Sequence, residues 1–170
     1  YQQMIDNLNA EETLANPADS GRLKFGKDEM YFSILGKPST EEPWMWQFGG
    51  HHLALNATIA GNRVTLSPSL TGGQPMRYEF KGKEVWLLKE EIRKAFLVLN
   101  SLSEEQKKVA VVGSRFAGMN YGPTARDIQP KPEGISGSDL NAAQKELLLS
   151  LINERIGILN PALAQSPIRQ

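Results

Sequence analysis

The spacing of apolar residues changes once along the chain, close to residue 80. Before that point, short apolar runs alternate with turn residues, which predicts strands mostly within residues 30–80. After it, apolar residues recur every three or four positions, which predicts helices mostly within residues 84–160. Strands followed by helices are typical of an α+β fold, so we expect an antiparallel sheet of about four or five strands in the first half, packed against helices from the second half. We interpret residues 1–170 as a single α+β domain or a segment of one.

Three apolar segments predict strands outside the clearest hairpin. The run from Met30 to Leu35 is short and aromatic, which indicates a buried strand. The run from Trp44 to Phe48 predicts a second strand with Trp44, Trp46 and Phe48 on one face, because side chains two apart share a face. A further short strand is expected from Met76 to Phe80.

The clearest hairpin consists of His51–Ala60 and Arg63–Ser69, joined by Gly61-Asn62. A two-residue loop of this composition is typical of a tight β-hairpin. Counting outward from the loop predicts these neighbours: Ile59 with Val64, Thr58 with Thr65, Ala57 with Leu66, Asn56 with Ser67, and His52 near Thr71. One face is then apolar and the other rich in hydroxyl groups, which supports this register.

Three segments have helical spacing. Tyr1–Leu14 predicts a short helix with Met4, Ile5 and Leu8 along one side, and Asn16-Pro17 would end it. A second helix is expected from Glu84, and a third from Leu140 to Leu159. The apolar stripe of the second helix would be Val85, Leu88, Ile92, Phe96 and Leu99.

A short motif occurs twice, as Leu102-Ser103-Glu104-Glu105-Gln106-Lys107 and as Leu140-Asn141-Ala142-Ala143-Gln144-Lys145. In both copies a residue that favours a helix N-cap precedes glutamine by three positions, which is the capping-box arrangement. Two helices that begin with the same local chemistry explain the similarity without a repeat or a function. Between them, residues 113–137 are rich in glycine and proline and predict an irregular loop that contains Arg115, Asn120, Tyr121, Arg126 and Asp127.

Composition and charge exclude several classes of function. Lys plus Arg number 19 and Asp plus Glu number 19, so no net charge attracts nucleic acid or an anionic membrane. The absence of cysteine excludes disulfides, zinc–thiolate sites and a cysteine nucleophile. No apolar run approaches the ~20 residues of a transmembrane helix. We therefore expect no nucleic-acid partner and no membrane span.

The two histidines, His51 and His52, are the first candidates for chemistry, because imidazole binds metals and transfers protons near neutral pH. In a regular strand they would point to opposite faces, with His52 on the same face as Asn56. They would then bind one divalent metal ion only if a bulge at Gly49-Gly50 re-aimed one ring, and carboxylates such as Glu79 or Asp127 would have to complete the site. The structural alternative is a hydrogen-bonded core histidine at 51 and a half-exposed one at 52.

A second candidate is the pair Trp44 and Trp46, whose indoles would share a face and could form a platform for a sugar or another flat ligand. The alternative is that both pack in the core. We expect a ligand site to use His52, Asn56, Trp44 and Trp46, and a metal site to use His51 and His52.

The segment around these residues resembles the domain-of-unknown-function family numbered thirty-five hundred. The resemblance is carried by Pro43-Trp44-Met45-Trp46, by Gly49-Gly50-His51-His52-Leu53, and by the two Leu-x-x-x-Gln-Lys motifs. The family pattern often has glycine at Met45 and an acidic residue at Gly49. The resemblance implies no established activity and implies frequent export signals.

Family members usually continue past the end of this chain, into a segment that contains His-x-His. We therefore expect an internal segment of a longer periplasmic or secreted precursor, and the rest of that precursor is an expected partner. Three functions remain open: a domain that binds a small molecule or protein, a metal-dependent hydrolase or oxidoreductase completed by residues outside this segment, and a purely structural domain.

Overall fold

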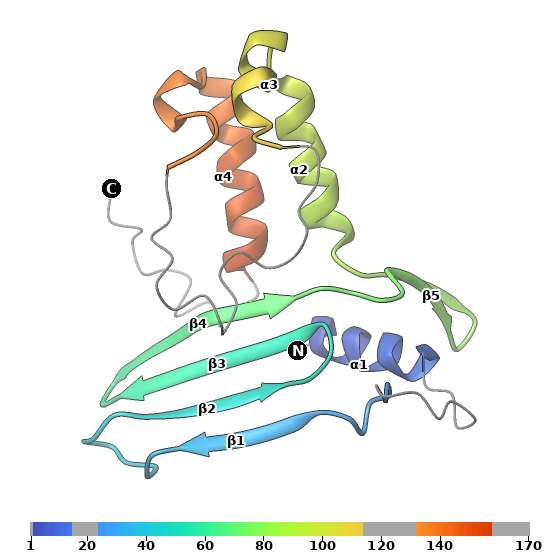
Figure 1. The fold of residues 1–170 in the computed structure, drawn as a ribbon, viewed down its shortest axis with the longest axis vertical. Helices are drawn as coiled ribbons and strands as arrows, with labels where there is room; N and C mark the ends of the chain where they lie inside the picture. The colour runs from blue at the N-terminus through green and yellow to red at the C-terminus, as the bar shows by residue number, and fades with distance from the viewer. Residues whose placement is uncertain (1, 15–23, 114–131, 158–170) are drawn as a thin grey trace. The chain divides into compact units, whose positions relative to one another are not determined.

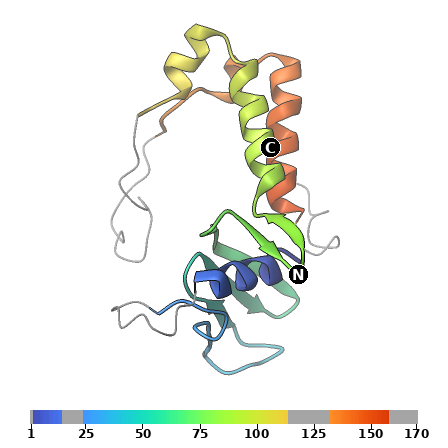
Figure 2. The same cartoon turned by 90° about the vertical axis from the view of Figure 1, so that its right-hand side faces the viewer.

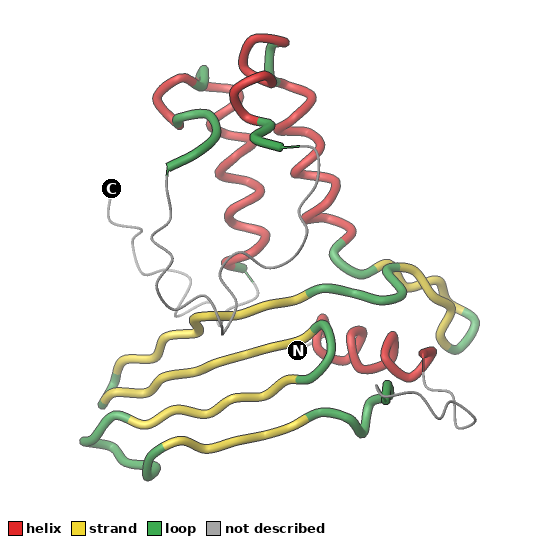
Figure 3. Tube along the Cα trace, viewed as in Figure 1, coloured by secondary structure: helices red, strands yellow, loops and turns green. Residues whose placement is uncertain are grey.

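The computed structural model describes residues 2–14, 24–113 and 132–157. These residues belong to two compact units, 1–89 and 90–170. In chain order the elements are α1 (Gln2–Leu14), β1 (Tyr31–Leu35), β2 (Trp44–Gly49), β3 (Leu53–Ala60), β4 (Arg63–Thr71), β5 (Arg77–Phe80), β6 (Lys83–Trp86), α2 (Lys89–Ser101), α3 (Glu104–Ala110), the 3-10 helix η1 (Gly137–Asp139) and α4 (Ala142–Ile156). Figures 1 and 3 show strands concentrated in the first half and helices in the second. The predicted α+β fold is confirmed, whereas the assignment of all residues to one domain stays a prediction.

A four-stranded antiparallel sheet with the order β1-β2-β3-β4 dominates the first unit. Across it, Ile34 pairs with Trp46, Trp46 with Ala57, and Ala57 with Leu66. Residues that pair directly point to the same face, so this face is apolar along its whole width. The strands predicted at Met30–Leu35 and Trp44–Phe48 are confirmed, because β1 and β2 begin and end within one residue of them.

The prediction that the first strand is buried is wrong. Every residue of β1 is exposed, with Tyr31 at 71% and Phe32 at 62%. The reason is that β1 lies at the edge of the sheet and pairs with β2 alone. An apolar run of five residues does not distinguish a central strand from an edge strand.

The predicted hairpin is confirmed next to its turn and departs from the prediction farther away. Ile59 pairs with Val64 and Ala57 with Leu66, but beyond Asn56 the register shifts by one residue. The second strand has one residue more than the first between the flanking pairs, which is a β-bulge, and it contains Pro68, which has no N–H to donate. Leu53, not His52, therefore pairs with Thr71.

The helix expected from Glu84 begins later than predicted. Residues 77–86 form a second hairpin, β5–β6, whose two-residue turn is Lys81-Gly82 with positive φ at both positions. Leu88 also has a positive φ of 54°, so a helix through Val85 and Leu88 is impossible. The turn at Lys81-Gly82 thus places residues 77–86 in a hairpin despite their helical spacing, and α2 begins only at Lys89.

Helix α1 confirms the first predicted helix but turns an unexpected side inward. Its buried residues are Asn7, Ala10 and Glu11, whereas Met4, Ile5 and Leu8 are only half-buried. Ala10 packs with Tyr78 and Leu87 in the core of this unit, next to the half-buried Met76, Val85 and Leu88. Figure 2 shows α1 beside the strands of the first unit. The inward side of this short helix thus carries two polar side chains.

In the second unit, α2 and α4 lie side by side and antiparallel (Figure 1). Lys94 of α2 donates to Glu154 of α4 at 2.6 Å, and Arg155 lies 3.6 Å from Glu91. The predicted final helix is confirmed as α4, while Leu159 lies outside the described residues. Among the residues that the structure describes, no helix has the length and apolar character needed to cross a membrane.

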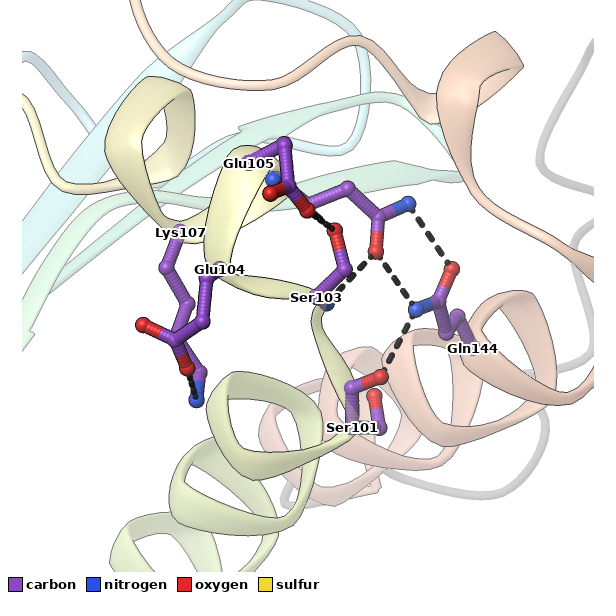
Figure 4. A network of polar contacts seen from close by, with 7 residues as sticks. Ser101, Ser103, Glu104, Glu105, Lys107 and Gln144 are labelled. Carbon is purple, nitrogen blue, oxygen red and sulfur yellow. Dashed lines mark hydrogen bonds and ion pairs between the residues drawn. The ribbon is translucent and has the colours of Figure 1, made fainter.

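Both predicted capping boxes are present. Ser103 accepts from the amide of Gln106 at the start of α3, and Asn141 accepts from the amide of Gln144 at the start of α4. The repeated motif therefore does begin two helices with the same local chemistry. Figure 4 shows the polar contacts around these starts.

The two glutamines of the capping boxes also bind each other. Gln144 Nε2 donates to Gln106 Oε1 at 2.8 Å, and Gln106 Nε2 donates back to Gln144 Oε1 at 3.2 Å. Each amide also donates to a carbonyl before the other helix, Gln144 to Ser101 O at 2.8 Å and Gln106 to Asp139 O at 2.9 Å. The motif thus joins the two helix starts by reciprocal bonds that local chemistry alone does not require.

Candidate functional site

Both histidines lie at the tip of the turn between β2 and β3. The first strand ends at Gly49, the second begins at Leu53, and the amide of Gly50 donates to Leu53 O at 2.8 Å. His52 has a φ of 56°, so the backbone here is not extended and the alternation of a strand does not apply. The ring centroids of His51 and His52 are 3.8 Å apart and the planes are inclined by 52°. The prediction that the two rings point to opposite faces is wrong.

Helix α1 supplies a carboxylate to this turn. Glu11 Oε2 lies 3.0 Å from Nδ1 of His51. The Glu11 side chain is 1% exposed and that of His51 is 34% exposed. When Glu11 is ionised and His51 is neutral, the carboxylate only accepts, so Nδ1–H is the donor and Nε2 keeps its lone pair. Within the described residues Nε2 has no hydrogen-bond partner, so the His51 ring is oriented by Glu11 and can accept a hydrogen bond.

His52 is positioned by the segment that follows β4. Its Nε2 lies 3.1 Å from Oε1 of Gln74, and its carbonyl accepts from the amide of Gly72 at 2.8 Å. A Cβ atom at Gly72 would lie 2.8 Å from Nδ1 of His52, which is closer than real Cβ contacts. Glycine at this position therefore allows the ring to lie against the backbone.

Two buried oxygens beside the histidines have no hydrogen-bond donor among the residues that the structure describes. The amide of Asn7 donates to Gly72 O at 3.1 Å, but Asn7 Oδ1 and Glu11 Oε1 accept no hydrogen bond within the described residues. The two residues are one helical turn apart and lie on one side of α1. A buried acceptor without a donor costs about 1–3 kcal/mol. The site therefore contains unpaired acceptors that weaken the fold.

A tyrosine fixes the helix that carries these acceptors. The hydroxyl of Tyr78 donates to Asp6 O at 2.6 Å. Burial, with a smaller contribution from the charge of Asp6, raises the pKa of Tyr78 to about 12. The phenol therefore stays protonated at neutral pH and keeps donating to α1.

A complete metal site is not found in the part of the chain that the structure describes. No group of three or more His, Asp or Glu residues is placed there to hold a metal ion. Nε2 of His51 and Nδ1 of His52 are the ring nitrogens without a hydrogen-bond partner among the described residues. Glu79 lies on β5, and Asp127 lies outside the described ranges, as do Arg115, Asn120, Tyr121 and Arg126.

The two tryptophans share a face of β2, as their spacing predicts, but have different surroundings. Trp46 stacks on Phe32 of β1 with ring centroids 6.1 Å apart. Trp44 donates its indole N–H to Ser39 O at 3.0 Å. Both are half-buried, and neither belongs to the buried core residues.

Asn56 is engaged within the sheet. Its Oδ1 accepts from Gln47 at 2.6 Å and its Nδ2 donates to Pro68 O at 2.6 Å. These contacts hold the bulged strand, whereas His52 contacts Gln74. The structure thus joins the predicted residues His51 and His52 to each other, and the contacts of Asn56 are separate from theirs.

Sequence reasoning missed Glu11 and Asn7. The signal was present in the helix pattern, because the two polar residues are four apart and flank Ala10 on one side of α1. Their partners, His51 and Gly72, lie 40 and 65 positions away along the chain. Nothing local in the sequence specifies such contacts.

Comparisons with known proteins give one result. Searches of curated proteins and of solved structures found no match. The model of one family, described as "Protein of unknown function (DUF3500)", matches residues 1–170. This match agrees with the resemblance noted around the tryptophans and histidines. The chain therefore belongs to the DUF3500 family of proteins of unknown function.

Proposed function

We propose that the first unit is a ligand-binding domain and that its ligand contacts Nε2 of His51. The observation that carries the proposal is the bond from His51 Nδ1 to the buried carboxylate of Glu11. It orients the ring and leaves the other nitrogen as an acceptor. The ligand class is therefore a small molecule that carries an O–H or N–H donor.

The free energy cost of burying the Glu11 carboxylate favours a functional role for Glu11 over a purely structural one. A carboxylate that is 1% exposed loses its hydration, which costs several kcal/mol before its one hydrogen bond within the described residues offsets part of the loss. A neutral side chain would connect α1 to the turn at a lower cost. Left-handed backbone at His52 adds strain at the same place. Strain that clusters in this way is typical of binding and catalytic sites.

The same pair can accept a proton as well as a hydrogen bond. If a ligand transfers its proton to Nε2, the resulting imidazolium remains paired with the Glu11 carboxylate at 3.0 Å. A carboxylate behind a histidine performs this role in general acid–base catalysis. Ligand binding at His51 is thus compatible with a reaction that transfers a proton.

The experiment is a screen of small alcohols, phenols and amines followed by histidine ¹H–¹⁵N spectra of the whole chain. We expect at least one compound to shift the Nε2 resonance of His51, and the same compound to bind the His51→Gln variant more weakly in a calorimetric titration. Asn56→Ala is the control, because its contacts lie within the sheet, and it should still respond. A panel without any compound that moves the His51 resonance would contradict the proposal.

A metal-dependent enzyme is the second candidate. The observation that favours it is the same carboxylate, because histidines that bind metals usually donate their other N–H to such a group. Further ligands would have to come from outside the described residues. Titration with zinc, manganese, copper and iron that leaves both histidine resonances unchanged would exclude this candidate.

An extracytoplasmic location is part of the proposal and rests on the family resemblance alone. Fractionation of cells that express the full gene tests it. Recovery of the protein only from the cytoplasmic fraction would contradict export and would leave the histidine site unaffected.

A further inference from the structure

A cleft lies in the hairpin that connects β1 to β2, at the other end of β2 from the histidines. Figure 1 shows the two strands that this hairpin joins. It has a volume of about 750 Å³ and is lined by Lys37, Pro38, Ser39, Thr40, Glu42 and Trp44. Clefts of about 300–1,000 Å³ are the usual size for small-molecule sites. The cleft is open to solvent over much of its boundary and leaves room for a sugar ring to lie against its lining residues.

The hairpin loop is held in shape by its own hydrogen bonds. Ser39 Oγ accepts from the amides of Glu41 and Glu42, both at 3.0 Å. Ser39 O accepts from the indole N–H of Trp44 at 3.0 Å. Because these bonds fix the loop without a ligand, binding would not have to order it.

The lining combines an apolar ring with charges of both signs. The N–H of Trp44 is occupied by Ser39, so the ring offers a ligand its apolar surface. Lys37 and Glu42 have no ion-pair or hydrogen-bond partner for their side chains among the residues that the structure describes. The cleft therefore offers a flat apolar wall, an N–H donor and a carboxylate acceptor, with no net charge.

We propose that this cleft binds a neutral sugar ring. The C–H face of a pyranose packs against an aromatic ring, and its hydroxyl groups both donate and accept hydrogen bonds. Glu42 would accept and Lys37 would donate, so both signs of charge are used. An anion would pair with Lys37 but be repelled by Glu42, and a purely apolar ligand would leave both charged groups without partners.

The cleft and the histidine site lie at opposite ends of β2. Trp44 is the first residue of β2, and the histidine turn follows its last residue, Gly49. At about 3.4 Å per residue, the six-residue strand keeps the two sites well apart. Either site can fail its test without affecting the other.

The test is titration of the full chain with cellotriose, chitotriose and maltotriose, monitored by the three tryptophan indole ¹H–¹⁵N resonances. We expect at least one sugar to shift the Trp44 resonance with a Kd of about 1 mM. Resonances of Trp86 should not move. No shift of Trp44 with any of the three sugars up to about 10 mM would overturn the proposal.

Three variants check that the lining residues cause the effect. Trp44→Phe keeps a smaller apolar ring, and its sugar affinity should fall, measured by calorimetry because the Trp44 resonance is absent. Trp46→Phe is the matched control on the same face of β2 and should bind as the native chain does, because Trp46 does not line the cleft. We also expect the double variant Lys37→Met with Glu42→Gln to weaken binding about tenfold while the backbone amide spectrum stays unchanged. Since both of these side chains are exposed, this variant tests the cleft even if Trp44→Phe fails to fold. Unchanged affinity in the double variant, or a Trp44 shift with free amino acids and none with sugars, would overturn the sugar assignment.

Discussion

Replacing Glu11 by glutamine should stabilise the first unit, although the residue holds His51 in place. The glutamine oxygen can replace Oε2 and accept from Nδ1 of His51, and its NH₂ group then lies where Oε1 has no partner. Asn7 lies one helical turn before Glu11 on the same side of α1, so we expect this NH₂ group to donate to Asn7 Oδ1, the other buried acceptor without a donor among the described residues. One substitution thus relieves both unpaired oxygens.

The magnitude follows from three contributions. Relief of the unpaired acceptors contributes about 1–3 kcal/mol, and removal of a buried charge adds to this. Replacing a charged hydrogen bond to His51 by a neutral one loses about 1 kcal/mol. We expect a net gain of about 1–2 kcal/mol, which for a unit of this size raises Tm by several degrees.

The assay is denaturant unfolding followed by tryptophan fluorescence. All three tryptophans, Trp44, Trp46 and Trp86, belong to the first unit, so the signal reports that unit alone. Glu12→Gln is the matched control, because Glu12 is 48% exposed and 3.8 Å from Lys27. It should change the free energy of unfolding by less than about 0.5 kcal/mol.

A destabilised Glu11→Gln variant would refute the reasoning. It would mean that the buried oxygens already have partners, such as ordered water, and that the carboxylate charge contributes to stability. Although we expect Glu11→Gln to raise stability, we expect it to lower the response to ligands. The stabilised variant should respond less to ligands at His51, because an amide stabilises a developing imidazolium less well than a carboxylate.

Three further predictions concern residues that position the histidine turn, the helix starts of the second unit and α1. Gly72→Ala should displace the His52 ring and lower the free energy of unfolding by about 1–3 kcal/mol. A changed His52 resonance and a lower unfolding midpoint would show this, whereas an unchanged resonance would contradict the close contact. Gln144→Ala should destabilise the second unit by about 2–4 kcal/mol, measured by helical circular dichroism, because its buried amide loses its hydrogen bonds. In that variant a further Gln106→Ala substitution should cost much less than Gln106→Ala alone, whereas additive effects would argue against reciprocal bonding. The pKa of Tyr78 is about 12 in the folded protein and about 10 in the unfolded chain. The stability that its protonated phenol contributes is therefore present below about pH 10 and lost as pH rises toward about 12. Denaturation midpoints across that window should fall more in the native protein than in Tyr78→Phe.

The sequence was informative wherever local rules determine structure. The Gly61-Asn62 turn and the alternation beside it predicted the pairing of Ile59 with Val64, because turn length fixes the register of a hairpin. Farther along, Pro68 and the bulge altered that register. A count outward from a turn does not detect an inserted residue.

The histidine site was predictable in identity but not in geometry. His51 and His52 were found because they are the only histidines, yet the glycines at 49 and 50 end the strand before them. The carboxylate behind His51 comes from a helix 40 residues earlier. Long-range contacts of this kind depend on tertiary packing, which a single sequence does not encode in any local pattern.

The reciprocal bonds between Gln106 and Gln144 also constrain how this family can evolve. Each amide bonds the other, so losing one glutamine removes a hydrogen-bond partner from its counterpart, and the cost is greatest where Gln144, which is buried, is the one left. Relatives should therefore keep both glutamines or replace both together, and an alignment would display correlated change at two columns 38 positions apart. A lineage that drifted at one column alone would need a new hydrogen-bonding group to take over.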